Sequence, residues 1–115
     1  MSMMVEPAGA PPRPARHVPI GKIVRDGTGT WGYMSGQLGI CPKKRALVSD
    51  DPGLQTERAI KNTQAIAKAN GFTMGDCVKT LVFLTSMDDF AAVNKVYAEY
   101  FPGDDVPARS CITVK

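Results

Sequence analysis

The stretch "VKTLVFLTSMDDFAAVNKVYAEYF", residues 78–101, decides the fold because a strand pattern and a helix pattern follow each other within it. Over 77–85 the residues alternate with a period of two, and both faces are largely apolar, which is typical of a central strand. Asp88 or Asp89 can then cap a helix. The apolar residues that recur at helical spacing are Phe90, Val93, Tyr97 and Phe101. We therefore expect a buried strand followed by a helix over 89–101.

Towards the N-terminus the sequence predicts a longer helix and, before it, a β-hairpin. Asp51 is a suitable N-cap, Pro52 suits the first helical position, and Gly71 suits the helix end, which indicates a helix over 52–70. The pair Asp26-Gly27 lies between two apolar runs and is typical of a tight turn between antiparallel strands.

Towards the C-terminus, "VPARSCITVK" (106–115) predicts a last strand that begins at Pro107, where a missing N–H is tolerated. The element order is then β-β-α-β-α-β. This order favours an α/β (α+β) class with a mixed sheet and both helices on one face. The opposite face would be bare and apolar, so we expect the chain to assemble into an oligomer.

Composition limits the domain organisation. The chain has 115 residues, which is enough for one domain, expected over 17–115. Residues 1–16 are rich in proline and are interpreted as a disordered tail, with a targeting segment as the alternative. The net charge of +3 is too small to indicate nucleic-acid binding by itself. No apolar run approaches a membrane span, and the three cysteines are interpreted as reduced thiols rather than as a metal site.

Arg109 and Cys111 are the candidate functional residues of the last strand. A guanidinium at the start of a strand can bind a carboxylate through two parallel hydrogen bonds. A salt bridge to Asp104 or Asp105 is the alternative, and local chemistry alone favours it. Cys111 lies two residues further on and shares the strand face of Arg109. The alternative is that Cys111 is a small, buried apolar residue with no chemical function.

Three segments together resemble one family. "SGQLGI" (35–40), residues 78–101 and "PARSC" (107–111) are similar to the reactive-intermediate deaminases, also called the RidA, YjgF or L-PSP family, some of which are described as endoribonucleases. The resemblance implies a chorismate-mutase-like fold and a homotrimer with clefts between subunits. It also implies hydrolysis of imines and enamines such as 2-aminoacrylate to 2-keto acids and ammonia, without a metal or an organic cofactor.

The resemblance assigns roles to individual positions. By similarity, Arg109 binds the substrate carboxylate and Cys111 lines the cleft. Ser35 and Gly36 match positions in the cleft wall, and Asn94 matches an asparagine near the pocket. The implied ligand is a small anionic imine or 2-keto acid. Separately, because the cysteines are interpreted as reduced thiols, we expect the protein in the cytoplasm, with the mitochondrion as the alternative.

Two departures from the family pattern keep other functions open. Ile23 stands where the family often has a cleft tyrosine. In the family the chain also continues past the "PARS" strand (107–110) into a final strand. That strand carries a glutamate that positions water, and the domain here is expected to lack both the strand and the glutamate. A trimer that binds small carboxylates without turnover is therefore an alternative to a deaminase. An L-PSP-type endoribonuclease is a further alternative, supported locally only by "PKKR" (42–45) and the basic tail.

Overall fold

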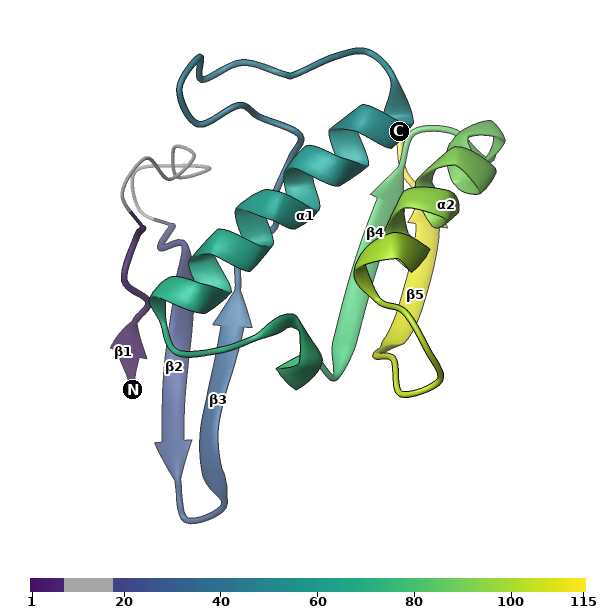
Figure 1. Cartoon of the computed structure of the whole chain (residues 1–115). Coiled ribbons are helices and arrows are strands. Elements are labelled where there is room, and N and C mark those ends of the chain that lie inside the picture. Colours follow the sequence, from purple (N-terminus) through teal and green to yellow (C-terminus); the bar gives the residue numbers. More distant parts are fainter. Residues whose placement is uncertain (8–17) are drawn as a thin grey trace.

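The computed structural model describes residues 1–7 and 18–115 of the chain (Figure 1). Its strands form an antiparallel sheet in the order β1-β2-β3 and a separate parallel pair, β4-β5. The strands are β1 (Ser2–Met3), β2 (Gly21–Asp26), β3 (Gly29–Met34), β4 (Lys79–Leu84) and β5 (Ala108–Thr113). The helices are α1 (Pro52–Ala69) and α2 (Phe90–Tyr100), with single turns η1 (Met74–Asp76) and η2 (Met87–Asp89).

The predicted mixture of helices and strands is confirmed, but the prediction of one continuous sheet is wrong. Within the described residues, no ladder of hydrogen bonds joins β3 to β4. The chain leaves β3 through a long loop and α1 before it begins β4, so no local turn imposes pairing between these two strands. β4 instead pairs with β5 after the crossover through α2. Both helices lie on the same side of the strands, as expected (Figure 1).

The hairpin between β2 and β3 forms at the predicted turn. The Asp26 carboxylate accepts hydrogen bonds from the backbone N–H of Thr28 at 2.7 Å and of Gly29 at 3.2 Å. The Thr28 hydroxyl also donates to Asp26, and it is the main reason why the pKa of this carboxyl lies below its usual value. Gly29 has a φ of 145°, a conformation that residues other than glycine rarely adopt.

The boundaries of α1 agree with the prediction to within one residue at its C-terminal end. Asp51 caps the helix by accepting the N–H of Leu54 at 2.8 Å, and Pro52 occupies the first turn. After Asn70 the chain turns at Gly71, whose φ is 83°. The cap of the second helical segment differs from the prediction: Ser86 caps η2 by accepting from Asp88 N–H, and Asp89 makes no side-chain cap bond.

The core lies between α1 and the β1-β2-β3 sheet. Its buried side chains are Met4, Ile20, Ile23 and Ile66, and Met34 and Phe72 pack against them. The predicted disordered tail over 1–16 does not hold for its first residues. Ser2 and Met3 pair with β2, and Met4 is only 6% exposed because it fills the space beside the side-chain-free Gly21 and Gly32. Residues 8–16 of the predicted tail, and residue 17 at the start of the predicted domain, lie outside the described residues.

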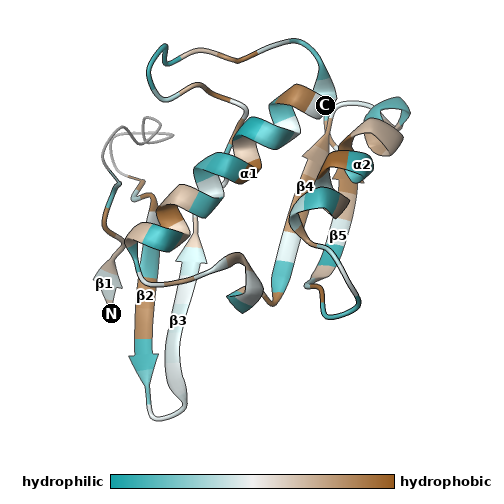
Figure 2. Ribbon diagram, in the orientation of Figure 1, coloured by the Kyte–Doolittle hydropathy of each residue, from teal (hydrophilic) through white to brown (hydrophobic). Residues whose placement is uncertain are grey.

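The face of the strands that points away from the helices is apolar and exposed. On β3, Trp31 and Tyr33 lie on this face, while Met34 packs against the core. On β4 and β5 it carries Leu81, Phe83 and Ile112, of which Leu81 is 62% exposed and Phe83 59% exposed. Figure 2 shows the apolar colouring that dominates the upper part of β4. We call these five residues the bare face.

Candidate functional site

The register of β4 and β5 points Arg109 towards α2. Thr80 pairs with Arg109 and Val82 with Cys111, so these four side chains lie on the helix-facing side of the parallel pair. There the Arg109 Nη1 donates a hydrogen bond of 2.8 Å to Oδ1 of Asn94 on α2. The structure thus brings together two of the residues that the resemblance singled out.

Aromatic rings of α2 hold the same guanidinium from another direction. The Arg109 Cζ lies 4.6 Å from the ring centroid of Tyr97 and 5.6 Å from that of Phe90. Both distances are within the range of cation–π attraction, which is worth about 0.5–2 kcal/mol depending on solvation. The hydroxyl of Tyr97 in turn shares a hydrogen bond of 2.7 Å with the Thr80 hydroxyl on β4. The guanidinium therefore has a fixed orientation between strand and helix.

None of the partners of Arg109 in the described part of the chain is a carboxylate. The alternative prediction, a salt bridge to Asp104 or Asp105, is not observed, and the ion pair found in that part of the chain joins Lys61 to Glu57. Asn94 is neutral and occupies one of the five N–H donors of a guanidinium. The arrangement therefore orients a positive charge without neutralising it, which leaves it able to bind an external anion.

Cys111 lies beside this site as a half-buried free thiol. It shares the helix-facing side of β5 with Arg109, as the spacing of two residues predicted. This placement agrees with the prediction that Cys111 lines the cleft next to the guanidinium.

Ser35 and Gly36 do not come together with Arg109 within one chain. They follow β3 in the antiparallel sheet, whereas Arg109 lies on β5 in the parallel pair (Figure 1). The Ser35 hydroxyl donates to the Pro19 carbonyl at 2.7 Å, and its N–H donates to the Ile20 carbonyl at 2.9 Å. Gly36 is exposed, and a Cβ at this position would meet open space.

Ile23, expected to stand at a cleft position, instead lies in the core at 6% exposure. It faces α1 and Met4 because the antiparallel register places it opposite Gly32, on the inner face of the sheet. Isoleucine at this position fits the packing of an apolar core.

Sequence reasoning missed the aromatic contacts around Arg109. Phe90 and Tyr97 belong to the apolar stripe of α2, and that pattern by itself predicts only packing against the sheet. The register between β5 and α2, which sequence periodicity does not supply, is what places a guanidinium under these rings. The polar tip of Tyr97, at the centre of that stripe, is the one signal that pointed to a polar partner.

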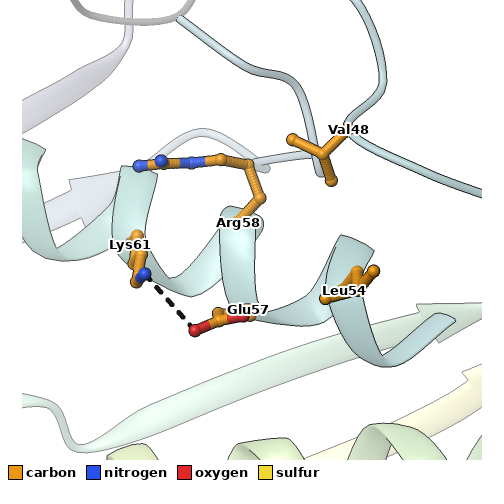
Figure 3. Close-up of a pocket in the computed structure, with 5 residues that line it drawn as sticks. All are labelled: Val48, Leu54, Glu57, Arg58 and Lys61. Carbon is orange, nitrogen blue, oxygen red and sulfur yellow. Dashed lines mark ion pairs between the residues drawn. The ribbon is translucent and has the colours of Figure 1, made fainter. Parts of the chain in front are cut away.

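A pocket among the described residues lies elsewhere. It has a volume of about 210 Å³ and lies on α1 beside the loop that precedes it, lined by Val48, Leu54, Glu57, Arg58 and Lys61 (Figure 3). Within it, Lys61 Nζ and Glu57 Oε1 form an exposed ion pair at 3.3 Å. None of the predicted site residues lines this pocket, and its own charges are already paired or directed elsewhere. It is therefore a surface hollow rather than the arginine site.

The described residues hold neither a membrane-spanning helix nor a cluster of metal ligands. No helix in residues 1–7 and 18–115 has the length and apolar character needed to cross a membrane. In the same part of the chain, no three His, Cys, Asp or Glu side chains gather as metal ligands.

Comparison with known proteins agrees with the resemblance. The family model described as "Endoribonuclease L-PSP" matches residues 13–115. A RutC family protein of Pyrococcus horikoshii is 41% identical over 86 residues, which cover 75% of this chain and 68% of that protein.

Solved structures give the same result. The structure of Escherichia coli TdcF with bound serine is 31% identical, with a TM-score of 0.83 over 99% of this chain and 86% of that one. RidA from an Antarctic Psychrobacter is 30% identical, with a TM-score of 0.82 over 97% of this chain and 85% of that one. The family match over residues 13–115 shows that the protein belongs to the family described as Endoribonuclease L-PSP, and the chain is also similar to a Rid protein in sequence and in fold.

Proposed function

We propose that the protein is a deaminase that hydrolyses imines and enamines of the 2-aminoacrylate type to 2-keto acids and ammonia. The single observation that carries the proposal is Arg109, a guanidinium fixed by Asn94 and by aromatic rings yet free of a carboxylate partner. Such a group suits the carboxylate that every member of this substrate class carries.

The proposed reaction asks little of the protein beyond orientation. The enamine 2-aminoacrylate tautomerises to 2-iminopropanoate, water adds to the imine carbon, and the carbon–nitrogen bond then breaks. Ammonia leaves and pyruvate remains. Arg109 binds the carboxylate and so fixes the imine carbon relative to an attacking water, an advantage in proximity that is large for small substrates. Cys111 forms the adjacent wall of the site.

We further propose that the active assembly is a homotrimer in which two subunits share each site. The bare face supports assembly because it exposes large side chains on both sheets, and exposed apolar patches of this kind mark interfaces. The separation of Ser35 and Gly36 from Arg109 within one chain supports a cleft between subunits. A neighbouring subunit would supply the Ser35–Gly36 wall opposite Arg109.

The test is the release of pyruvate from freshly generated 2-aminoacrylate. We expect the wild-type chain to accelerate this step over buffer. We expect Arg109→Ala to lower kcat/KM by about a hundredfold, because charge-assisted hydrogen bonds to the carboxylate are lost. Arg25→Ala, which removes an exposed arginine of the hairpin, is the matched control and should retain full activity. Equal activity in Arg109→Ala and the wild type would reject the assignment.

Carboxylate binding without turnover is the second candidate. It is favoured by the absence, among the described partners of Arg109, of any carboxylate that could activate water. Calorimetric titration with pyruvate separates the two functions. Saturable binding that Arg109→Ala abolishes, together with no acceleration of 2-aminoacrylate hydrolysis, identifies a binding protein.

RNA cleavage is the activity named in the family description. The exposed run Lys43, Lys44 and Arg45 supports it locally. Incubation with single-stranded RNA at low and high salt tests it, because contacts to phosphate weaken steeply as salt rises. Salt-sensitive retention and cleavage of RNA that are both lost in a triple Lys43, Lys44 and Arg45 to Gln variant would favour this candidate over the deaminase.

A further inference from the structure

One buried polar side chain on α1 has no part in the site described above. Asn62 is 1% exposed, and all its polar atoms are in use. Its Nδ2 donates to the carbonyl of Ile40 at 2.9 Å and to that of Leu38 at 3.3 Å. Its Oδ1 accepts from Arg58 Nε at 3.0 Å. A fully satisfied polar group at this depth specifies one geometry of the segment that it contacts.

Asn62 contacts the loop after β3, which polar contacts hold against α1. Leu38 is 65% exposed and Leu47 is 54% exposed, so neither anchors the loop by burying apolar surface. Gly39 lies directly on the helix, since a Cβ there would come within 2.7 Å of the Gln55 backbone. The Gly39 carbonyl accepts from Val48 N–H at 2.9 Å, which folds the loop back on itself.

Two anchors therefore define the stretch that carries the proposed wall residues. On one side Ser35 is fixed to the Pro19 and Ile20 carbonyls. On the other side Asn62 fixes the Leu38 and Ile40 carbonyls. Gly36 lies between the anchors, exposed and beside open space. The position of the wall is thus set by both anchors together.

We propose that Asn62 is a positioning residue that holds the Ser35–Gly36 wall in the geometry that meets the substrate. The inference rests on the proposed function, since it assigns a role within the same site. Asn62 touches no substrate itself. It acts through the two carbonyls, and its loss lets the segment between the anchors move away from the substrate, so that binding weakens more than the chemical step.

The test uses a nearly isosteric variant. Asn62→Asp keeps the volume and can still accept from Arg58, but it loses both donations to the loop. We expect its KM for 2-aminoacrylate and its Kd for pyruvate to rise about tenfold, in line with two buried carbonyls left without donors, while kcat changes less than threefold. Hydrogen exchange at residues 36–41 should also become faster. Arg58→Met removes the third contact and leaves the loop donations in place, so its KM should stay near that of the wild type.

Stability needs a control of its own, because a buried substitution can lower activity by unfolding the protein. Ile66→Ala, one turn further along α1 and 0% exposed, destabilises the core and leaves both hydrogen bonds from Asn62 to the loop in place. It should lower the unfolding midpoint and leave KM and the exchange at 36–41 unchanged. A KM in Asn62→Asp within twofold of the wild type, or an equal rise in Ile66→Ala, overturns the positioning role.

Failure of the proposed function gives a different result. If the wild-type chain neither hydrolyses 2-aminoacrylate nor binds pyruvate, the proposed function is rejected. In that case hydrogen exchange is the only remaining test of whether Asn62 anchors the loop. Unchanged exchange at 36–41 in Asn62→Asp would overturn it, and selectively faster exchange there would support it.

Discussion

The two halves of the molecule bury apolar surface very differently. The half made of β1-β2-β3 and α1 closes its own core around Met4, Ile20, Ile23 and Ile66. The half made of β4, α2 and β5 buries only Leu84 and Val93 among its larger apolar residues. The second half carries Arg109 and much of the bare face. The first half thus encloses its own core, whereas the second half, with the candidate site, leaves most of its apolar residues exposed, which is why we propose that a partner subunit covers it.

The largest expected effect comes from a charge on the bare face of the second half. Phe83→Glu would place a carboxylate at the centre of the proposed interface between subunits, where removal from water without a partner is strongly unfavourable. We expect the assembly to dissociate into monomers, as measured by sedimentation equilibrium. Deaminase activity should fall with it, because each proposed site needs two subunits.

Gln64→Glu is the matched control for this variant, because it adds the same charge at an exposed position of α1. It should leave the assembly intact. If Phe83→Glu sediments as the wild type does, the bare face is not the interface and the comparison between the halves loses its functional meaning.

The next largest effect concerns the core of the first half. Met4→Ala removes a side chain that fills the space beside Gly21 and Gly32, and it should lower the free energy of unfolding by about 2–5 kcal/mol. Its neighbour Met3 is 55% exposed, so Met3→Ala should change that free energy by less than about 0.5 kcal/mol. Urea denaturation at one fixed protein concentration measures both, since assembly makes stability depend on concentration.

Equal effects of the two methionine variants would mean that Met4 does not complete the core.

The contrast between Met4 and the other core residues also shows what the sequence could not predict. The elements of residues 18–115 could be predicted because each has local signals, such as the Asp26 turn, the Asp51 cap and the period of β4. Met4 could not, because it lies in a segment of proline-rich composition and joins the core only through pairing with β2, a contact between distant parts of the chain.

The candidate site shows the same limit. Family resemblance selected Arg109, Asn94 and Cys111, and the structure brings the first two into contact. Periodicity could not show that Tyr97 and Phe90 face the guanidinium, since that depends on how α2 lies across β5. Nor could it show that β3 and β4 belong to separate sheets, because edge strands and central strands can have the same apolar pattern.

A third prediction tests how the second half orients Arg109. Tyr97→Leu removes the ring 4.6 Å from the guanidinium, and the Kd for pyruvate should rise by about threefold to thirtyfold, the range of a cation–π contact. Tyr97→Phe keeps the ring and loses only the Thr80 hydrogen bond, so Kd should change by less than about threefold. Calorimetry measures both. A similar loss in the two variants would show that the hydroxyl, rather than the ring, positions Arg109.

The smallest effect compares two thiols, that of Cys41 in the loop between β3 and α1 and that of Cys77 just before β4. The pKa of Cys41 lies below its usual value because the backbone N–H groups of Lys44 and Lys43 donate to its sulfur, with the charges of Lys44 and Arg58 adding to the effect. Burial raises the pKa of Cys77. Since the thiolate is the reactive form, iodoacetamide should modify Cys41 at a lower pH than Cys77, as followed by peptide mass spectrometry.

A Lys44→Gln variant refines the thiol comparison. It removes one charge but keeps the backbone donors, so the pH at which Cys41 becomes reactive should rise only slightly and should remain below that of Cys77. If Cys77 reacted first, burial in the second half would be weaker than the structure indicates. If Cys41 in Lys44→Gln became no more reactive than Cys77, side-chain charge rather than the backbone of the 41–45 loop would control the thiol. The order of modification therefore shows whether N–H donors in the 41–45 loop lower one thiol pKa while burial raises the other.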